Sequence, residues 1–408
     1  MTNELTPAQR QFVDSYLDAA GEELIAFRRR MHSQPELSGE EYATTEAIVS
    51  RLLVADLNPI VLPSGTGVIC DVTSPNATAD SPVVAIRCDI DALAMNDESY
   101  APYASTRDGV AHCCGHDVHT TIVLGAGLLL TRLLHAEDAP QGTVRLIFEP
   151  SEETIPGGSV EIVAEGYLDG VSAIYGLHCD PKVDIGHVGV TDGAVASAAD
   201  VVELDVLGPG GHTARPENTV DMIRVAAMLA SELPRRMTEV TAGPNEVRLT
   251  FGSLQAGDAP NVIPTTAHLE GTMRAQNREG WQSAGGHLEN LIEQELGPTG
   301  AHWRVDYSKG VPPIVNDPAT TAVLREAVAD VLSPEAIVPT GQSWGGDTFA
   351  WYLEEIPGTY VRLGTHDPES GEERLDLHAG TFDVDERSIT IGVRLMVATA
   401  LAWLKQSQ

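Results

Sequence analysis

The sequence predicts an α/β fold in which a mostly parallel central sheet is interrupted by a smaller α+β domain. Two patterns carry this prediction. In the first half of the chain, short β-rich runs alternate with helical segments, as is typical of parallel sheets with crossover helices. After Gly193 the alternation stops, and it returns only in the last quarter of the sequence. Because 408 residues are too many for one ordinary hydrophobic core, we expect two domains.

The larger domain begins with two expected helices, at residues 22–31 and 41–53, which a polar turn separates. Strand and helix then alternate, in segments that we expect at residues 83–88, 120–134, 144–148, 159–165 and 173–177. The helix at residues 120–134 has apolar side chains almost all round its axis, which predicts that it is buried.

The middle of the chain has a different composition of elements. We expect strands at 200–207, 246–251 and 266–274 and helices at 220–233 and 280–295. The α/β pattern returns with a helix at 319–332, a strand at 359–363 and a helix at 387–404. The sequence therefore predicts a discontinuous domain of residues 1–192 and 311–408, with an inserted domain of residues 193–310.

The composition is that of a globular protein, with 42% hydrophobic and 21% charged residues. The formal net charge of −34 repels phosphate groups, so we expect no nucleic-acid partner and no anionic membrane partner. No apolar run is expected to reach membrane-spanning length. Residues 1–7 lack the basic start and apolar core of a signal peptide, so a cytoplasmic location is expected.

Side chains that can bind metals gather at the ends of three predicted strands and in one turn before a helix. They are Asp89, Asp91, Glu152, Glu153, His178, Cys114 and His116. The carboxyl ends of strands in an α/β sheet meet at one edge, where ligands bind. Sulfur, imidazole and carboxylate donors together suit a transition metal. The sequence therefore predicts a metal site at this edge.

Each of these residues also has a structural interpretation. A single cysteine is usually a small buried hydrophobe, and a single histidine is often only a hydrogen-bonding partner. Adjacent glutamates are usually solvated, and aspartates at strand ends usually cap the next element. The five cysteines form no disulfide framework and no C-x-x-C pair, so Cys113 and Cys114 do not indicate a redox site.

Eight short motifs occur in order along the chain, at residues 29–37, 87–93, 114–119, 149–153, 210–216, 261–264, 271–274 and 377–386. Together they resemble the M20 family of metallopeptidases and amidohydrolases. The similar branch is the aminoacylase-like one, with hippurate hydrolases, IAA–amino acid hydrolases and N-acetyl-diaminopimelate deacetylases. The resemblance implies a zinc-peptidase-like catalytic domain and a ferredoxin-like inserted domain that serves as lid and dimerisation domain.

The resemblance also implies two divalent metal ions per subunit, drawn from zinc, manganese, cobalt and nickel. The implied ligands are Cys114, His116, Glu153, His178 and His378. Glu152 is the implied general base, which takes a proton from a water activated by the metals and returns it to the leaving amine.

Further roles follow from the same resemblance. His212 is expected to reach the developing oxyanion, in its own or a partner subunit. Asn261 and Arg274 are expected to contact the substrate, Arg274 through its fork of donors. Asp89 and Asp117 are expected to orient ligand imidazoles from outside the metal shell.

The implied function is a hydrolase that cleaves the amide bond of N-acyl amino acids, with N-acetyl, N-benzoyl or similar acyl groups. Its partner would be a small N-acyl amino acid or short peptide, and the protein would be a homodimer or a higher homo-oligomer. A dipeptidase or carboxypeptidase on the same scaffold, and a non-catalytic metal-binding protein, remain alternatives. The chain departs from the family pattern at Cys113 and at Asp347 and Thr348, which leaves the wall of the substrate pocket open.

Overall fold

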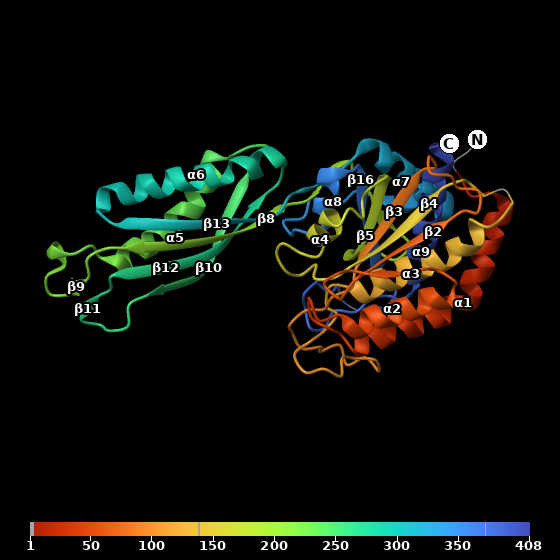
Figure 1. The fold of residues 1–408 in the computed structure, drawn as a ribbon. Helices are drawn as coiled ribbons and strands as arrows, with labels where there is room; N and C mark the ends of the chain where they lie inside the picture. The colour runs from red at the N-terminus through yellow and green to blue at the C-terminus, as the bar shows by residue number, and fades with distance from the viewer. Residues whose placement is uncertain (1–3, 138, 372) are drawn as a thin grey trace. The chain divides into compact units, whose positions relative to one another are not determined.

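The computed structural model describes residues 4–137, 139–371 and 373–408. Residues 1–3, which are part of the segment 1–7 discussed above as lacking signal-peptide features, lie outside the described residues. The chain forms two compact units (Figure 1). Unit 1 comprises Met1–Val195, Asn316–Gly341 and Trp351–Gln408, and unit 2 comprises Ala196–Val315 and Gln342–Ala350. The short segment Gln342–Ala350 thus belongs with unit 2, although Asn316–Gly341 of unit 1 separates it from the rest of that unit in the sequence.

Unit 1 is built on an eight-stranded sheet with the order β1-β2-β4-β3-β5-β16-β6-β15. The strands are β1 (Ile60–Val61), β2 (Val68–Thr73), β3 (Val83–Asp89), β4 (Thr143–Glu149), β5 (Val171–Asp184), β6 (Val188–Gly189), β15 (Ile337–Val338) and β16 (Gly358–His366). The four central strands β4, β3, β5 and β16 pair in parallel, whereas β1 and β2 are antiparallel additions at one edge. The predicted α/β class with a mostly parallel central sheet is confirmed.

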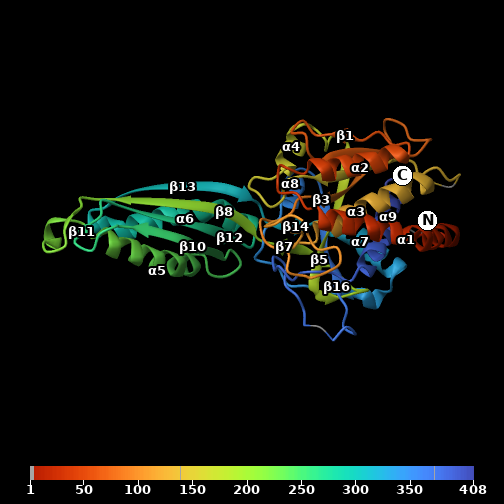
Figure 2. The ribbon, with the colours of Figure 1, turned by 90° about the horizontal axis from the view of Figure 1, so that it is seen from below.

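Helices surround this sheet (Figure 2). They are α1 (Pro7–Ser33), α2 (Tyr42–Val54), α3 (His116–Leu133), α4 (Ser159–Ala164), α7 (Pro318–Val331), α8 (Phe349–Glu355) and α9 (Arg387–Gln406). α3 and α9 pack closely because a glycine lies at their contact: a Cβ at Gly392 would overlap the side chain of Ile122. α3 is buried along nearly its whole length, as its all-round apolar pattern predicts.

Two helices differ from their expected form. α1 begins at Pro7, because Thr6 and Gln9 form a capping box that starts the helix about four turns before the expected residue 22. α9 is long and apolar enough to cross a membrane, although no apolar run of that length was expected from the sequence. However, 72% of the most apolar 18-residue stretch of α9 is buried inside the structure. Such burial is typical of the core helix of a globular protein.

His178 does not end its strand, as the sequence suggested, but lies inside β5. The pairing of β5 with β3 stops at Gly176, opposite Arg87, while the pairing with β16 continues through His178 and beyond. His178 therefore still lies just past the edge formed by β3 and β4, on a strand that β16 extends.

Unit 2 is a four-stranded antiparallel sheet with the order β10-β12-β8-β13. Its strands are β8 (Ala198–Leu207), β10 (Val247–Ala256), β12 (Thr266–Ala275) and β13 (His302–Val311). Helices α5 (Met222–Val240) and α6 (Arg278–Leu296) pack on one face of this sheet, and β9 (Gly211–His212) pairs with β11 (Val262–Ile263) beyond it (Figure 1). β13 was not expected from the sequence, because its residues alternate between exposed and half-buried without a strong apolar face. The remaining strands are the short β7 (Gly193–Ala196) and β14 (Ile314–Asn316).

Candidate metal centre

Cys114 and His116 are presented by the turn that starts α3. Gly115 between them is the N-cap of α3 and has a φ of +90°, in the left-handed region. A Cβ at Gly115 would lie only 3.0 Å from the Cβ of Cys179 and 3.1 Å from its Sγ. Glycine is therefore required here twice, for the backbone conformation and for the close approach of β5. The turn directs both side chains toward the ends of the parallel strands.

The five predicted ligands lie together in unit 1. The Sγ of Cys114 is 3.3 Å from the Nε2 of His178 and 3.3 Å from the Nε2 of His378. The Oε1 of Glu153 is 3.5 Å from the Nε2 of His378 and 3.8 Å from the Nε2 of His116. These side chains come from the start of α3, the loop after β4, the middle of β5 and the loop before α9.

Within the described part of the chain, side chains here form four overlapping groups of possible donors: two contain Cys114, one combines His116 with Glu152 and Glu153, and one combines His116 with Asp89 and His119. Cys114, His116 and His178 form one of the two groups that contain Cys114, and Cys114, Glu153 and His378 form the other, with all donor atoms of each group within 4.8 Å of one another. A thiolate can bridge two cations, and Cys114 is the residue common to both groups. Cys114 would therefore be a ligand common to two cations, if both groups of donors hold one.

Buried atoms without partners show that the donor set fits metal ions. Among the described residues, the Nε2 of His116 and the Oε1 of Glu153 are buried and accept or donate no hydrogen bond. Buried polar atoms are otherwise nearly always satisfied, so an orphaned imidazole nitrogen and carboxylate oxygen facing each other are what a cation site leaves. Sulfur, nitrogen and carboxylate donors suit zinc, manganese, cobalt or nickel.

Hydrogen bonds fix which ring nitrogen each histidine presents. The Nδ1 of His116 lies 3.0 Å from the carbonyl oxygen of Asp91 and 3.3 Å from its carboxylate. The Nδ1 of His178 donates to the carbonyl oxygen of Cys179 at 2.7 Å. Both rings therefore turn Nε2 toward the donor groups. The residue that orients His116 is Asp91, which the sequence placed at the strand end without giving it this role.

His378 is held by its backbone. Its φ is +58°, a left-handed conformation that residues other than glycine rarely adopt. Its N–H donates to the carbonyl oxygen of Cys113 at 2.9 Å, which ties the loop before α9 to the Cys114 turn. Cys113 thus contributes through its backbone, and burial raises the pKa of its thiol to about 12, so it stays protonated.

Asp89 and Asp117, expected to orient ligand imidazoles, contact other groups. Asp89 accepts from the Nδ1 of His119 at 2.7 Å and from Arg87 at 2.7 Å, while the Nε2 of His119 accepts from the N–H of Cys179 at 2.8 Å. Asp117 accepts from Arg28 at 2.6 Å and lies 2.8 Å from the Nδ1 of His32. These carboxylates stabilise the structure around the ligands and hydrogen-bond none of the predicted ligand imidazoles.

Without a cation, the surroundings favour the protonated forms of Cys114 and His116 and the neutral form of His178. Burial raises the pKa of the Cys114 thiol above its usual range. Burial alone would lower the pKa of His116, but the Asp89 carboxylate and Cys114 raise it. Burial lowers the pKa of His178, and nearby His119 adds to the effect. A bound cation would displace the protons of Cys114 and His116, because the ligand forms are a thiolate and a neutral imidazole, whereas His178 is already neutral.

Glu152 stands beside the donors but outside the two groups that contain Cys114. Its Oε2 is 3.9 Å from the Nε2 of His116, and its side chain is 10% exposed. A carboxylate in this place reaches solvent and the donor groups together, so it can exchange a proton with a water held there.

The remaining predicted residues, His212, Asn261 and Arg274, belong to unit 2. His212 lies in β9, is exposed, and accepts from the N–H of Ala214 through Nδ1 at 3.0 Å. The exposed Asn261 precedes β11, and its carbonyl oxygen accepts from Thr213 at 3.3 Å. Arg274 is half-buried near the end of β12, where burial lowers the pKa of its guanidinium.

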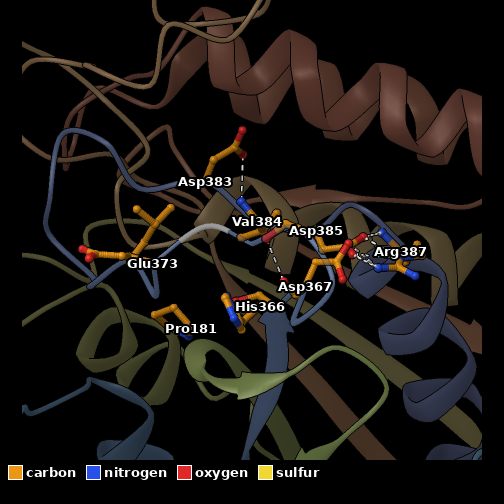
Figure 3. Close-up of a pocket in the computed structure, with 11 residues that line it drawn as sticks. Pro181, His366, Asp367, Glu373, Asp383, Val384, Asp385 and Arg387 are labelled. Atoms are coloured by element: carbon orange, nitrogen blue, oxygen red, sulfur yellow. Dashed lines mark hydrogen bonds and ion pairs between the residues drawn. The ribbon is translucent and has the colours of Figure 1, made fainter.

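A separate pocket of about 460 Å³ is lined by residues from both sides of His378 in the sequence (Figure 3). Asp367, Asp385 and Arg387 line it, and Arg387 reaches Asp385 at 2.8 Å and Asp367 at 3.0 Å. Asp383 also lines it and accepts from the N–H of Val384 at 2.8 Å. These aspartates are thus paired within the protein, and none of the five predicted ligands lines the pocket.

Comparison with known proteins places this arrangement among metal-dependent hydrolases. A family model described as peptidase family M20/M25/M40 matches residues 85–402. N-acetylcysteine deacetylase of Bacillus subtilis (strain 168) is 34% identical over 383 residues, which is 94% of this chain and 97% of that protein. A solved Bacillus subtilis structure, the YXEP protein, described as a dinuclear metal-binding peptidase from the M20 family, has a TM-score of 0.82 at 32% identity, covering 95% of this chain and 99% of that one.

A longer relative matches more closely in sequence. A protein of Rhodococcus jostii (strain RHA1), named as a glutamate–cysteine ligase 2-3, is 41% identical over 379 residues, which is 92% of this chain but 46% of that protein. The chain therefore spans about half the length of this relative, and the name of the relative describes a larger protein.

Proposed function

The chain belongs to the peptidase family M20/M25/M40, and from that premise we propose that it is a metal-dependent amidohydrolase that cleaves the amide bond of N-acyl amino acids. The observation that carries the proposal is the sharing of Cys114 by two groups of donors, with Glu152 next to both groups. Two metals with a carboxylate beside them can activate a water for attack on an unactivated amide.

We assign two divalent ions to the residues that surround Cys114. Cys114, His116 and His178 would hold one, and Cys114, Glu153 and His378 the other. When bound, the ions make water more acidic and polarise the amide carbonyl. Zinc, manganese, cobalt and nickel all suit these donors.

The chain's own residues perform the proton transfers. The Glu152 carboxylate accepts a proton from the attacking water as the water oxygen bonds to the acyl carbon. It then delivers that proton to the nitrogen as the carbon–nitrogen bond breaks, which releases a carboxylic acid and an amine; the acid then ionises, and its proton passes to the amine or to solvent. A carboxylate that is bound to a metal is a weak base. This supports Glu153 as a metal ligand and Glu152 as the residue that accepts the proton.

Substrate contacts are proposed for three residues of unit 2. His212 would donate to the carbonyl oxygen as negative charge develops there, since its Nδ1 acts as an acceptor and the proton is then on Nε2. Arg274 would bind the substrate carboxylate, and Asn261 would hydrogen-bond the amide. The half-buried position of Arg274 supports its role, because a partly desolvated guanidinium binds a carboxylate more strongly.

N-Acetylcysteine is the first substrate to test. The Bacillus subtilis relative named for deacetylation of this compound matches 94% of this chain. A dipeptidase or carboxypeptidase on the same scaffold is the alternative, since it would differ only in the group on the acyl side.

Metal reconstitution followed by an amide panel tests the proposal. Apo-protein is loaded separately with zinc, manganese, cobalt and nickel, and is assayed with N-acetylcysteine, other N-acetyl and N-benzoyl amino acids, and dipeptides. We expect hydrolysis of N-acyl amino acids in at least one metal form and none in the apo-protein. Preference for dipeptides would favour the peptidase alternative, and bound metal without hydrolysis of any amide would favour a non-catalytic metal-binding protein.

We propose further that the protein is a cytoplasmic homodimer that associates through unit 2. Exposed apolar side chains on this unit, among them Ile223 at 48% and Val262 at 52% exposure, support an association surface next to His212. The five described cysteines are free, which suits a reducing compartment. Light scattering coupled to size exclusion would give twice the chain mass of 43.4 kDa, and a monomer would contradict the proposal.

A further inference from the structure

The turn that carries Glu152 is held on both sides by buried carboxylates from other parts of unit 1. The N–H of Ser151, before Glu152, donates to the Oε1 of Glu41 at 2.8 Å. The N–H of Glu153, after Glu152, donates to the Oδ2 of Asp91 at 3.0 Å. Asp91 follows β3 and also orients His116, whereas Glu41 comes from the segment between α1 and α2.

Glu41 is fully buried and does not do what a glutamate at its position usually does. It is the N-cap of α2, but its side chain makes no cap hydrogen bond. Instead the Oε1 accepts from the N–H of Gly39 at 2.9 Å as well as from Ser151. The Oε2 is buried without a partner among the described residues, and burial raises the pKa of this carboxyl. Burying a carboxyl group with one oxygen unpartnered costs free energy of folding. We therefore look for a functional role in the hydrogen bond that Glu41 makes to the turn.

Ser151 has a φ of +57°, in the left-handed region. Only glycine enters this region without strain, so a serine there must be held by its surroundings. The hydrogen bond to Glu41 provides that restraint. Without it, the backbone at Ser151 would relax toward a negative φ, and the direction in which Glu152 leaves the turn would change.

We propose that Glu41 is a positioning residue for the hydrolysis: by accepting the N–H of Ser151, it fixes the left-handed turn that aims Glu152 at the donor groups. Glu41 touches neither substrate nor metal ligands in this role. The inference rests on the proposed function for the identity of Glu152 as the base, but the contact between Glu41 and Ser151 is independent of it.

Kinetics and hydrogen exchange test the two parts separately. In the metal-loaded protein we expect Glu41→Ala to lower kcat at least about 10-fold with KM changed less than about twofold, because the base is displaced while the substrate contacts remain. Glu41→Gln keeps an acceptor oxygen and should stay within about threefold of the parent. Glu40→Ala, which removes the exposed neighbouring glutamate, should behave like the parent.

Exchange of the Ser151 amide, followed by mass spectrometry on the peptide that contains it, gives a result that needs no activity. We expect at least about 10-fold faster exchange in Glu41→Ala and parent-like protection in Glu41→Gln and Glu40→Ala. A double variant, Glu41→Ala with Ser151→Gly, should regain part of the lost kcat, since glycine adopts the left-handed turn unaided.

Glu41→Asp serves if Glu41→Ala does not fold, since it keeps the charge and withdraws the acceptor by one methylene. It should show the same loss of kcat and of Ser151 protection. Unchanged kcat in folded Glu41→Ala or Glu41→Asp, or unchanged exchange at Ser151 in these two variants, would overturn the proposal. In one further outcome, the parent protein hydrolyses no amide while the Ser151 amide still exchanges faster in Glu41→Ala than in the parent. That result would contradict the proposed function but would support the restraint of Ser151 by Glu41.

Discussion

Single residues in rare backbone conformations shape the metal centre. Gly115, Ser151 and His378 all have positive φ, and each adjoins or is one of the metal-binding or proton-transfer residues. Conformations of this kind persist only where the surrounding structure holds them, and they are concentrated at functional sites. Gly115 adopts its conformation because it is a glycine. The other two are held by contacts: Ser151 by the carboxylate of Glu41, and His378 by the carbonyl oxygen of Cys113.

Gly115 gives a direct stability prediction. Gly115→Ala adds a Cβ to a left-handed residue and places it 3.0 Å from Cys179, so we expect the free energy of unfolding to fall by about 2 kcal/mol or more and cobalt affinity to fall with it. Gly109→Ala is the matched control, since Gly109 has a φ of +74° but no atom within 4 Å of the added Cβ. Urea unfolding of both variants gives the comparison. Equal losses would show that the close approach to Cys179 does not matter.

At the scale of elements, Arg28 connects three segments of unit 1. From α1 it reaches Asp117 at the start of α3 at 2.6 Å, and Asp383 and Glu386 before α9 at 2.8 and 3.4 Å. The OH of Tyr103 donates to the other oxygen of Asp383 at 2.8 Å. Because His116 begins α3 and His378 precedes Asp383, this buried cluster sets the spacing of two predicted ligands.

Removal of Arg28 should destabilise the protein strongly. Arg28→Met leaves the fully buried Asp117 without its main partner, and we expect a loss of about 3–5 kcal/mol in the free energy of unfolding. Arg29→Met removes an adjacent arginine whose side chain is 48% exposed, and should cost less than about 1 kcal/mol. Urea unfolding at fixed metal content measures both. A small effect at Arg28 would mean that the cluster contributes little beyond packing.

The loop that contains Asp97 gives a pH prediction. Burial would raise the pKa of Asp97, but hydrogen bonds from Ser99 and Ser105 lower it below its usual value. A lowered pKa in the folded state adds stability above the unfolded pKa of about 4, and this stability is lost as the pH falls through the folded pKa. We expect Asp97→Asn to lose about 1–3 kcal/mol at a pH of about 7 and much less at a pH of about 3.

Unfolding at the two pH values measures this difference. Asp108→Asn, at an exposed position of the same segment, is the control and should change stability by less than about 0.5 kcal/mol at either pH. If Asp97→Asn lowers the free energy of unfolding equally at both pH values, the ionised Asp97 carboxylate is not the source of the stability.

At the scale of the whole molecule, the net charge of −34 dominates the electrostatics. Like charges repel in the folded state, and salt screens this repulsion over a Debye length of about 10 Å at about 0.1 M. We therefore expect Tm to rise by several degrees between about 0.02 and about 0.5 M KCl. Calorimetry measures Tm in KCl and, as an uncharged control, in sucrose, which stabilises proteins only because it is excluded from their surface. A Tm that falls as KCl is added would contradict the expectation.

The parts of the molecule that follow local rules could be predicted from the sequence. Alternating strands and helices predicted the parallel sheet, and the strand ends predicted where Asp89, Glu152 and Glu153 would lie. His378 could be named only by resemblance, because it stands 200 residues from His178 in a loop without periodicity. Tertiary contacts decide which aspartate orients His116. It is Asp91, whereas Asp89 and Asp117 were expected to orient the ligand imidazoles.

Long-range contacts also decide which parts of the chain belong together. The segment Gln342–Ala350 joins unit 2 because Gln342 donates to the carbonyl oxygen of Gln276 at 2.6 Å and Trp344 stacks on Arg248 at 3.7 Å. No local pattern indicates these contacts. Asp347 and Thr348, which depart from the family pattern, therefore belong to the same unit as His212 and Arg274.

Turnover by the Glu152→Gln variant tests the central claim most directly. The amide side chain keeps the shape of glutamate but cannot accept the proton, so we expect hydrolysis of the best N-acyl amino acid to fall about 10²–10⁴-fold. Metal content, measured on the same sample, should remain at two ions per chain. Parent-like hydrolysis by Glu152→Gln with both metals bound would contradict the mechanism.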